Sequence, residues 1–154
     1  MAIIYDKESE TFYEQRIIDN QTIELGMNLT DWNDKHKAWY NIYLTVFNKR
    51  KDMWNNMDKK VITGKNPFAT FTIARDMFYD IEAAVLRYEF VYRDTEEVVL
   101  YCGWVDNRRR NAYYRFLSSL GYDWGTTLEL KKCIQKVYKI ENVNPEVFDN
   151  VDNE

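Results

Sequence analysis

The sequence predicts a mainly α protein: a compact bundle of about four to five helices with a possible small β element, namely an N-terminal hairpin, a strand at 97–105, or both. Apolar residues recur at helical steps of three and four through the middle of the chain. The composition, 45% hydrophobic and 16% aromatic with only five Gly and two Pro, is that of an ordered globular protein. An α+β fold is the alternative.

The first long helix is predicted over residues 31–60. Thr30 and Asp31 are favourable N-cap residues. The apolar residues that follow recur at steps of three, four or seven: Trp32, Trp39, Tyr43, Val46, Met53, Trp54 and Met57. A second helix is predicted to begin at Asn66 and Pro67, a capping residue followed by a proline that suits the first helical position. Its apolar positions alternate steps of three and four: Phe71, Ala74, Phe78, Ile81, Val85, Tyr88 and Tyr92.

The apolar run at 98–105, VVLYCGWV, fits either a buried strand or a buried helix. Asp94 with Glu97 three residues later resembles a capping box and favours a helix. Gly103 and the valines favour a strand. The helix is the preferred interpretation, and the strand stays open.

Asp106 or Asn107 is predicted to cap a helix over 108–120 that stops at Gly121. A last helix is predicted from Thr126 or Thr127, with an apolar side made of Leu128, Leu130, Ile134, Val137 and Tyr138. The first 27 residues are less periodic, and they fit either a hairpin that turns at Asp19 and Asn20 or two short helical pieces.

The predicted domain organisation is a single helical domain over 1–139 and an acidic C-terminal tail over 140–154, docked on a partner or a neighbouring subunit. Charge alternates along the chain: residues 1–34, 66–105 and the tail are acidic, whereas 35–65 and 106–139 are basic. Such blocks can neutralise one another within the fold or between copies, so a basic stretch does not by itself predict a basic surface.

The stretch WVDNRRRNAYYRF, residues 104–116, supplies most of the candidate interaction residues. Guanidinium groups beside aromatic rings suit phosphates and bases. The sequence pI near 5.2 disfavours a dedicated nucleic-acid binder, and the arginines are better assigned to protein carboxylates. The candidates are Arg108, Arg109, Arg110, Arg115, Tyr113, Tyr114, Trp104 and Trp124, together with Val147 and Phe148 in the tail.

Residues 98–122, VVLYCGWVDNRRRNAYYRFLSSLGY, resemble the final strand and helix of the GNAT acetyltransferases, in which an Asn-containing turn leads into a helix that ends in a Gly-aromatic pair. The resemblance implies an acyltransferase that uses an acyl-coenzyme A. Counted back from Gly121, the position where the family often carries a leaving-group acid Tyr is Leu117, and the family's Asn falls at Arg110. The Arg- and Gly-rich loop that cradles the cofactor pyrophosphate is replaced by TGKNP at 63–67, and two long predicted helices stand where that fold has strands.

No catalytic, cofactor-binding or metal-binding residue is predicted from spacing. His36 is the only His, so a His-pair metal site is excluded. Ser118 and Ser119 lie in no nucleophile pattern. Cys102 and Cys133 are predicted to be structural thiols, because neither has a neighbouring His and a protein without a secretion signal usually keeps its cysteines free.

The function predicted from these features is a non-enzymatic protein-protein interaction or assembly protein, a homo-oligomer or part of a larger assembly, with no cofactor. Fourteen Asn, with abundant Lys, Tyr and Ile, suggest an AT-rich genome such as that of a phage, where a virion ring or connector would fit. The alternatives are an inhibitor of a host nucleic-acid-handling complex, a nucleic-acid-binding protein and the GNAT-like acyltransferase. The predicted location is the host cytoplasm or the virion, because the chain has neither a secretory signal nor an apolar run long enough to span a membrane.

Overall fold

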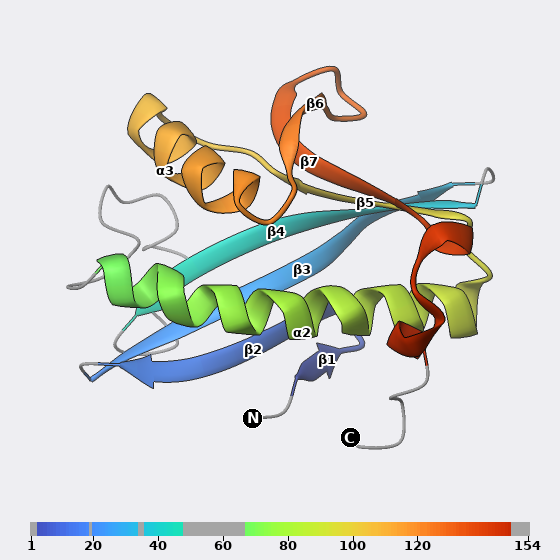
Figure 1. The fold of residues 1–154 in the computed structure, drawn as a ribbon, viewed down its shortest axis with the longest axis horizontal. Coiled ribbons are helices and arrows are strands. Elements are labelled where there is room, and N and C mark those ends of the chain that lie inside the picture. Colours follow the sequence, from blue (N-terminus) through green and yellow to red (C-terminus); the bar gives the residue numbers. More distant parts are fainter. Residues whose placement is uncertain (1–2, 19, 34–35, 48–66, 149–154) are drawn as a thin grey trace. The chain divides into compact units, whose positions relative to one another are not determined.

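The computed structural model describes residues 3–18, 20–33, 36–47 and 67–148, and strands dominate them (Figure 1). Seven strands form one mixed sheet in the order β1-β2-β3-β4-β5-β7-β6. The α-helices within the described ranges are α2 and α3. The prediction of a mainly α bundle of four to five helices was therefore wrong.

The elements follow one another as β1 (Ile4–Asp6), β2 (Thr11–Ile18), β3 (Gln21–Asn33), β4 (Lys37–Phe47), α2 (Pro67–Arg93), β5 (Glu97–Cys102), α3 (Asn107–Ser118), β6 (Asp123–Thr126), β7 (Lys132–Lys139) and the short 3-10 helices η2 (Ile140–Asn142) and η3 (Pro145–Phe148). The chain divides into two compact units, one made of 1–27 and 43–85 and the other of 28–42 and 86–154.

The first unit begins with a hairpin in which β1 pairs antiparallel with β2, from Ile4 opposite Tyr13 to Asp6 opposite Thr11. The chain then turns at Asn20, which has a φ of 62°, and this confirms the predicted hairpin at this position. Short polar Asn tolerates the left-handed backbone that such a tight turn requires. The buried apolar residues of this unit come from β2, β3, β4 and α2: Phe12, Ile23, Leu25, Met27, Val46, Phe47, Ala74, Met77, Phe78, Ile81, Ala84 and Val85.

The helix predicted from Pro67 is confirmed as α2. Its apolar stripe has the expected burial, since Ala74, Phe78, Ile81 and Val85 are all buried. Toward its C-terminal end the stripe is less covered, and Tyr92 is 71% exposed. The periodicity predicted this helix because the alternating steps of three and four persist from Phe71 to Tyr92, far longer than chance alternation.

The second unit is built on β4, β5, β7 and β6. β4 pairs with β5 in parallel, from Lys37–Glu97 to Asn41–Tyr101. β5 then pairs antiparallel with β7 over Glu97–Cys102, and β7 pairs with β6 at the edge of the sheet. The core of this unit includes Tyr40, Val98, Leu100 and Ile134, all of which are at most 1% exposed.

Three predicted helices are corrected. Of the helix predicted over 31–60, residues 31–33 lie in β3 and 37–47 in β4, whereas 34–35 and 48–60 lie outside the described residues. The preferred helix at 98–105 is wrong, because 97–102 form β5. The helix predicted from Thr126 or Thr127 is also wrong, because a turn over 127–131 leads into β7.

The reason for the first two errors is burial on both faces of a strand. Trp39 and Tyr40 are adjacent on β4 and point to opposite faces, yet both are buried. A strand covered on both sides shows no alternation of apolar and polar residues, so its apolar positions also match helical steps. The enrichment of aromatic and β-branched residues in WYNIYLTVF at 39–47 is the signal that favours a strand.

Within the described ranges, no helix is long and apolar enough to cross a membrane. The prediction that 1–139 is helical is wrong together with the predicted fold class. The predicted boundary of the tail at residue 140 stays a prediction. η2 and η3 show that residues 140–148 are folded as short turns.

Candidate functional site

The helix α3 leaves the carboxyl end of β5 through a short turn, and it is the element that positions the candidate site. Asp106 is its N-cap, and Oδ1 of this residue accepts a 2.8 Å hydrogen bond from the backbone N–H of Arg109. The predicted stop at Gly121 is confirmed by its φ of 92°, a conformation that favours glycine. The predicted helix over 108–120 is thus confirmed as α3, close to its expected bounds.

Three aromatic rings from separate elements gather on one side of α3 in the second unit. Tyr114 of α3 stacks on Trp124 of β6 with ring centroids 4.3 Å apart and an angle of 6° between the planes. Trp104, in the turn after β5, meets the same Trp124 edge-on at 5.8 Å. One face of the Trp124 ring is therefore covered by Tyr114, while 49% of the residue remains exposed.

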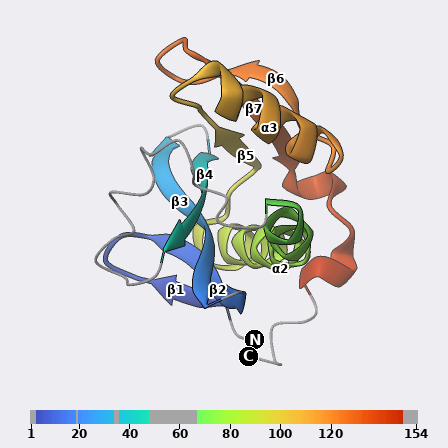
Figure 2. The ribbon, with the colours of Figure 1, turned by 90° about the vertical axis from the view of Figure 1, so that its left-hand side faces the viewer.

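A pocket of about 570 Å³ opens beside these rings, between α3 and the β6–β7 hairpin, which lie next to each other in Figure 2. We call it the α3–β6 pocket. It is lined by Trp104, Arg110, Asn111, Trp124, Gly125, Thr126 and Lys132. Its size is within the usual range for small-molecule sites.

The charge of the α3–β6 pocket is positive. Arg110 and Lys132 line it, and no carboxylate does. Nε and Nη2 of Arg110 each donate a 3.3 Å hydrogen bond to Oδ1 of Asn111. Among the described residues neither Arg110 nor Lys132 has a carboxylate partner. Two uncompensated cations in a cavity attract an anion.

The opposite side of α3 faces the protein interior. Arg109 is 5% exposed, and its Nη1 lies 3.0 Å from Oδ2 of Asp106. Nε and Nη2 of Arg109 have no hydrogen-bond partner within the described part of the chain. Tyr113 is half-buried one helical turn further on; burial raises the pKa of its phenol, nearby Cys102 and Asp106 add to this, and Arg109 opposes it.

Two free thiols lie beneath this side of α3. Burial raises the pKa of Cys102 to about 12, with a further contribution from the neighbouring Cys133. Burial raises the pKa of Cys133 to about 11. Both thiols therefore stay protonated at neutral pH, which agrees with the predicted structural role, since the thiolate is the reactive form.

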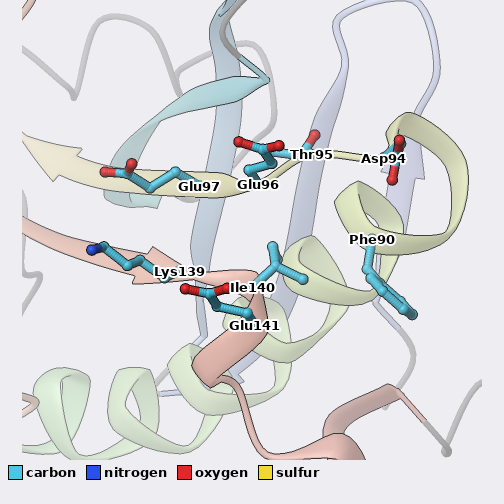
Figure 3. Close-up of a pocket in the computed structure, with 8 residues that line it drawn as sticks. All are labelled: Phe90, Asp94, Thr95, Glu96, Glu97, Lys139, Ile140 and Glu141. Atoms are coloured by element: carbon cyan, nitrogen blue, oxygen red, sulfur yellow. The ribbon is translucent and has the colours of Figure 1, made fainter.

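A second pocket, of about 530 Å³, has the opposite charge (Figure 3). It lies between the C-terminal end of α2, the start of β5 and the end of β7. Its lining residues are Phe90, Asp94, Thr95, Glu96, Glu97, Lys139, Ile140 and Glu141. The carboxylate of Glu97 also lies 3.6 Å from Nζ of Lys37.

The structure brings some predicted interaction residues together and separates others. Trp104, Arg110 and Trp124 line one pocket, and Tyr114 supports it. Arg108 and Arg115 are exposed and do not line it. Arg109 and Tyr113 lie on the interior side of α3.

The tail residues Val147 and Phe148 lie elsewhere in the second unit. Phe148 stacks on Phe90 of α2 with centroids 4.4 Å apart, and the carbonyl of Val147 accepts a 3.5 Å hydrogen bond from Arg87. The tail thus contacts its own chain. Its docking on a partner, and the expected protein partners themselves, stay predictions.

Sequence reasoning missed Asn111, Gly125, Thr126 and Lys132 as pocket residues. Lys132 and Gly125 reach the site through the hairpin of β6 and β7, a pairing that the predicted helix at this position concealed. Asn111 follows Arg110 directly in the sequence, and an amide next to an arginine on a helix is a usable polar pair.

In the described part of the chain, no cluster of His, Cys, Asp or Glu has the arrangement to hold a metal ion. No protein-family model and no curated protein matches the sequence. Solved structures do match. The N-terminal domain of the ribosomal-protein-alanine acetyltransferase from Clostridium acetobutylicum ATCC 824 is 12% identical, with a TM-score of 0.38 over 92% of this chain and 98% of that one.

Spermidine N-acetyltransferase from Vibrio cholerae, in a complex with CoA and spermine, is 13% identical, with a TM-score of 0.35 over 80% of this chain and 68% of that one. A chimera of the same enzyme is 14% identical, with a TM-score of 0.37 over 88% of this chain and 69% of that one. These are the proteins to which the chain is similar.

The predicted non-enzymatic assembly protein and virion component is corrected. It depended on a helical bundle with aromatic stripes, and the chain instead forms a seven-stranded mixed sheet. The prediction of a protein without enzymatic activity depended on the same helical bundle and is corrected with it.

Proposed function

We propose that the chain is an acyltransferase of the GNAT type that takes its acyl group from an acyl-coenzyme A. The observation that carries the proposal is the path of residues 97–122. They run as strand β5, a turn capped by Asp106, helix α3 and the Gly121–Tyr122 pair, which is the strand-turn-helix order that the sequence resemblance requires. The first of the two long predicted helices spoke against that resemblance, and residues 31–33 and 37–47 of it lie in the strands β3 and β4 instead.

The parallel pairing of β4 with β5 supports a ligand site at the carboxyl end of β5. α2 connects these strands, whereas β5 pairs with β7, and β7 with β6, in antiparallel fashion. In open sheets, ligands bind beyond the carboxyl ends of parallel strands, where successive connections diverge. The α3–β6 pocket begins at Trp104, two residues after the end of β5.

The edge of β4 fits the pantetheine arm of coenzyme A. The register with β5 ends at Asn41–Tyr101, but β4 continues to Phe47. Among the described residues, none of β5 pairs with residues 42–47, so the backbone N–H and C=O groups on that edge of β4 are open to another partner. A pantetheine arm carries amide groups that can pair with a strand edge. When bound, the coenzyme would supply an activated thioester.

Two positions depart from the family pattern and leave the acid for the departing thiol unassigned. Leu117, at the position of the family's Tyr, is 2% exposed. Tyr113 lies four residues earlier on the same face of α3, and its pKa is raised, so it keeps its proton. Arg110 occupies the position of the family's Asn and lines the pocket. The segment 63–67 lies outside the described residues.

The proposal keeps the cytoplasm as the predicted location. Both cysteines in the chain are free and buried, as is usual in a reducing compartment.

A thermal-shift and thiol-release experiment tests the proposed function. Acetyl-, succinyl- or a longer acyl-coenzyme A should raise the melting temperature, because a ligand that binds only the folded state at 100 times its Kd stabilises it by about 2.7 kcal/mol. Acetyl phosphate, an acyl donor without a pantetheine arm, is the control and should produce no shift. Incubation with a mixed pool of amines should then release free coenzyme A thiol. If none of the acyl-coenzymes A shifts the melting temperature, the proposed function is wrong.

A further inference from the structure

We infer that helix α3 of a second copy of this chain docks onto the second pocket, of about 530 Å³, which we call the acidic pocket (Figure 3). The side chains that meet its carboxylates are Arg108 and Arg115, which are exposed and do not line the α3–β6 pocket. We call these two residues the arginine face. The inference goes beyond the proposed function, because it concerns a partner of the chain and not the acyl donor.

The charges of the arginine face are not neutralised within the described part of the chain. Arg109 on the interior side of α3 pairs with the carboxylate of Asp106. Arg108 and Arg115, in contrast, have no carboxylate partner among the described residues. They are seven residues apart, so they lie on one side of the helix, two turns and about 10 Å from each other. The helix therefore presents two unpaired cations from a rigid backbone.

The acidic pocket carries an excess of negative charge. Four carboxylates and one ammonium group line it: Asp94, Glu96, Glu97, Glu141 and Lys139. The carboxylate of Glu97 lies 3.6 Å from Nζ of Lys37, whereas the other three have no ion-pair partner among the described residues. The C-terminal end of α2, directly before Asp94, adds the negative end of the helix dipole. A cation is the partner that this charge attracts.

The shape of the acidic pocket suits the flat head of an arginine. Phe90 lines it and is 48% exposed, and its ring is backed by that of Phe148, with centroids 4.4 Å apart. Glu97 belongs to β5 and Glu141 to η2, so the carboxylates come from separate walls (Figure 3). A guanidinium can stack on such a ring while its donors reach carboxylates on more than one side. Within the described ranges no cluster of carboxylates is arranged to hold a metal ion, so an organic cation is the better fit.

Within one chain the arginine face and the acidic pocket lie at opposite ends of β5. The helix α3 follows the carboxyl end of this strand at Cys102, whereas Glu97, which lines the pocket, is its first residue. Six residues of strand span about 17–20 Å, a distance that an arginine side chain does not bridge. The two surfaces can therefore meet between copies but not within one copy.

A second copy is the partner that the charges favour. The chain has a net charge of −4 and a sequence pI near 5.2, which disfavours a nucleic acid as the partner of the arginines. Two copies bring together unpaired charges of opposite sign that this chain itself carries, and such complementarity speeds association and fixes its register. Because the two surfaces differ, the contact either occurs twice about a two-fold axis or continues head to tail.

Size-exclusion chromatography with light scattering, on the nuclease-treated full chain, tests the inference. The mean mass should rise with protein concentration and fall toward that of the monomer, 18.7 kDa, as salt rises. Two double variants, Arg108→Glu with Arg115→Glu and Glu96→Lys with Glu141→Lys, should each weaken self-association at least about tenfold, because each sets like charges against one another. An equimolar mixture of the two double variants should associate again, since every surface then finds one of opposite charge on the other variant. A loss that came from misfolding would not be reversed by mixing.

Asp76→Lys with Asp80→Lys is the matched control for the acidic pocket, because it makes the same change in net charge at exposed positions of α2 outside the pocket. It should leave self-association as it is in the parent chain. The inference is overturned if the parent stays monomeric at every concentration in low salt, if the reversed variants associate as the parent does, or if their mixture stays monomeric. It is also overturned if the control weakens self-association as much as the pocket variant.

Discussion

The hydroxyl of Tyr40 on β4 donates a 2.6 Å hydrogen bond to Oε2 of Glu89 near the C-terminal end of α2. Glu89 is fully buried. Its Oε1 accepts a 2.7 Å bond from the hydroxyl of Thr95, and Nε of Arg93 lies 3.3 Å from Oε2. A buried carboxylate is tolerated only when its oxygens are satisfied, so these contacts anchor the end of α2 to β4 in the second unit.

Replacement of Tyr40 by Phe should lower the free energy of unfolding by about 1–3 kcal/mol, because it leaves a buried carboxylate oxygen with one fewer donor. Denaturant unfolding measures the change. Tyr92→Phe removes the same atom from a residue that is 71% exposed, and it should change stability by less than about 0.5 kcal/mol. Equal losses in the two variants would contradict the anchoring role of Tyr40.

Gly26→Ala should destabilise the first unit by about 1–3 kcal/mol, because the added Cβ would collide with the ring of Tyr43. That ring has little room to move, since its hydroxyl donates a 2.6 Å hydrogen bond to the buried Glu24. Gly103→Ala is the control, because a Cβ there meets no atom within 4 Å. Thermal unfolding of both variants should show a loss of stability for Gly26→Ala only.

Asp106→Ala should cost about 2 kcal/mol or more, since it removes both the N-cap of α3 and the carboxylate that faces the buried Arg109. Asp106→Asn separates the two effects, because its side-chain oxygen can still cap the helix but carries no charge. Its loss of stability, measured in urea, should be smaller than that of the Ala variant and should report the charge alone. If Asp106→Asn lost as much stability as Asp106→Ala, this would argue against a contribution from the cap.

The stability of the fold should fall as pH rises above 9. Burial raises the pKa of Cys102 from its ordinary value of 9.0 to about 12 in the folded chain, so only the unfolded chain ionises this thiol between those values. The contribution is intact below pH 9 and is lost toward pH 12, on the order of 2 kcal/mol between pH 9 and 11. Cys102→Ala should show a shallower decline over that range. An unchanged slope would show that the thiol does not contribute.

Local signals in the sequence were sufficient for two helices and one turn. The stripe from Ala74 to Val85 repeats over many turns, and the cap at Asp106 and the stop at Gly121 act on neighbouring backbone groups. The turn at Asn20 is of the same kind. These features depend on residues close to one another in the chain, so they can be recognised without knowledge of the partner segments.

The sequence by itself thus determined α2, α3 and the stop at Gly121, while it left the N-terminal hairpin open beside two short helical pieces. Its resemblance at 98–122 indicated the class of enzyme proposed here. Only the tertiary structure decided that 37–47, 97–102 and 132–139 are strands, because their hydrogen-bond partners lie on distant segments. In 37–47 and 97–102, burial on both faces also hides the alternation of a strand. The α3–β6 pocket has the same origin. Trp124 and Lys132 meet Arg110 only once β6 and β7 pair beside α3.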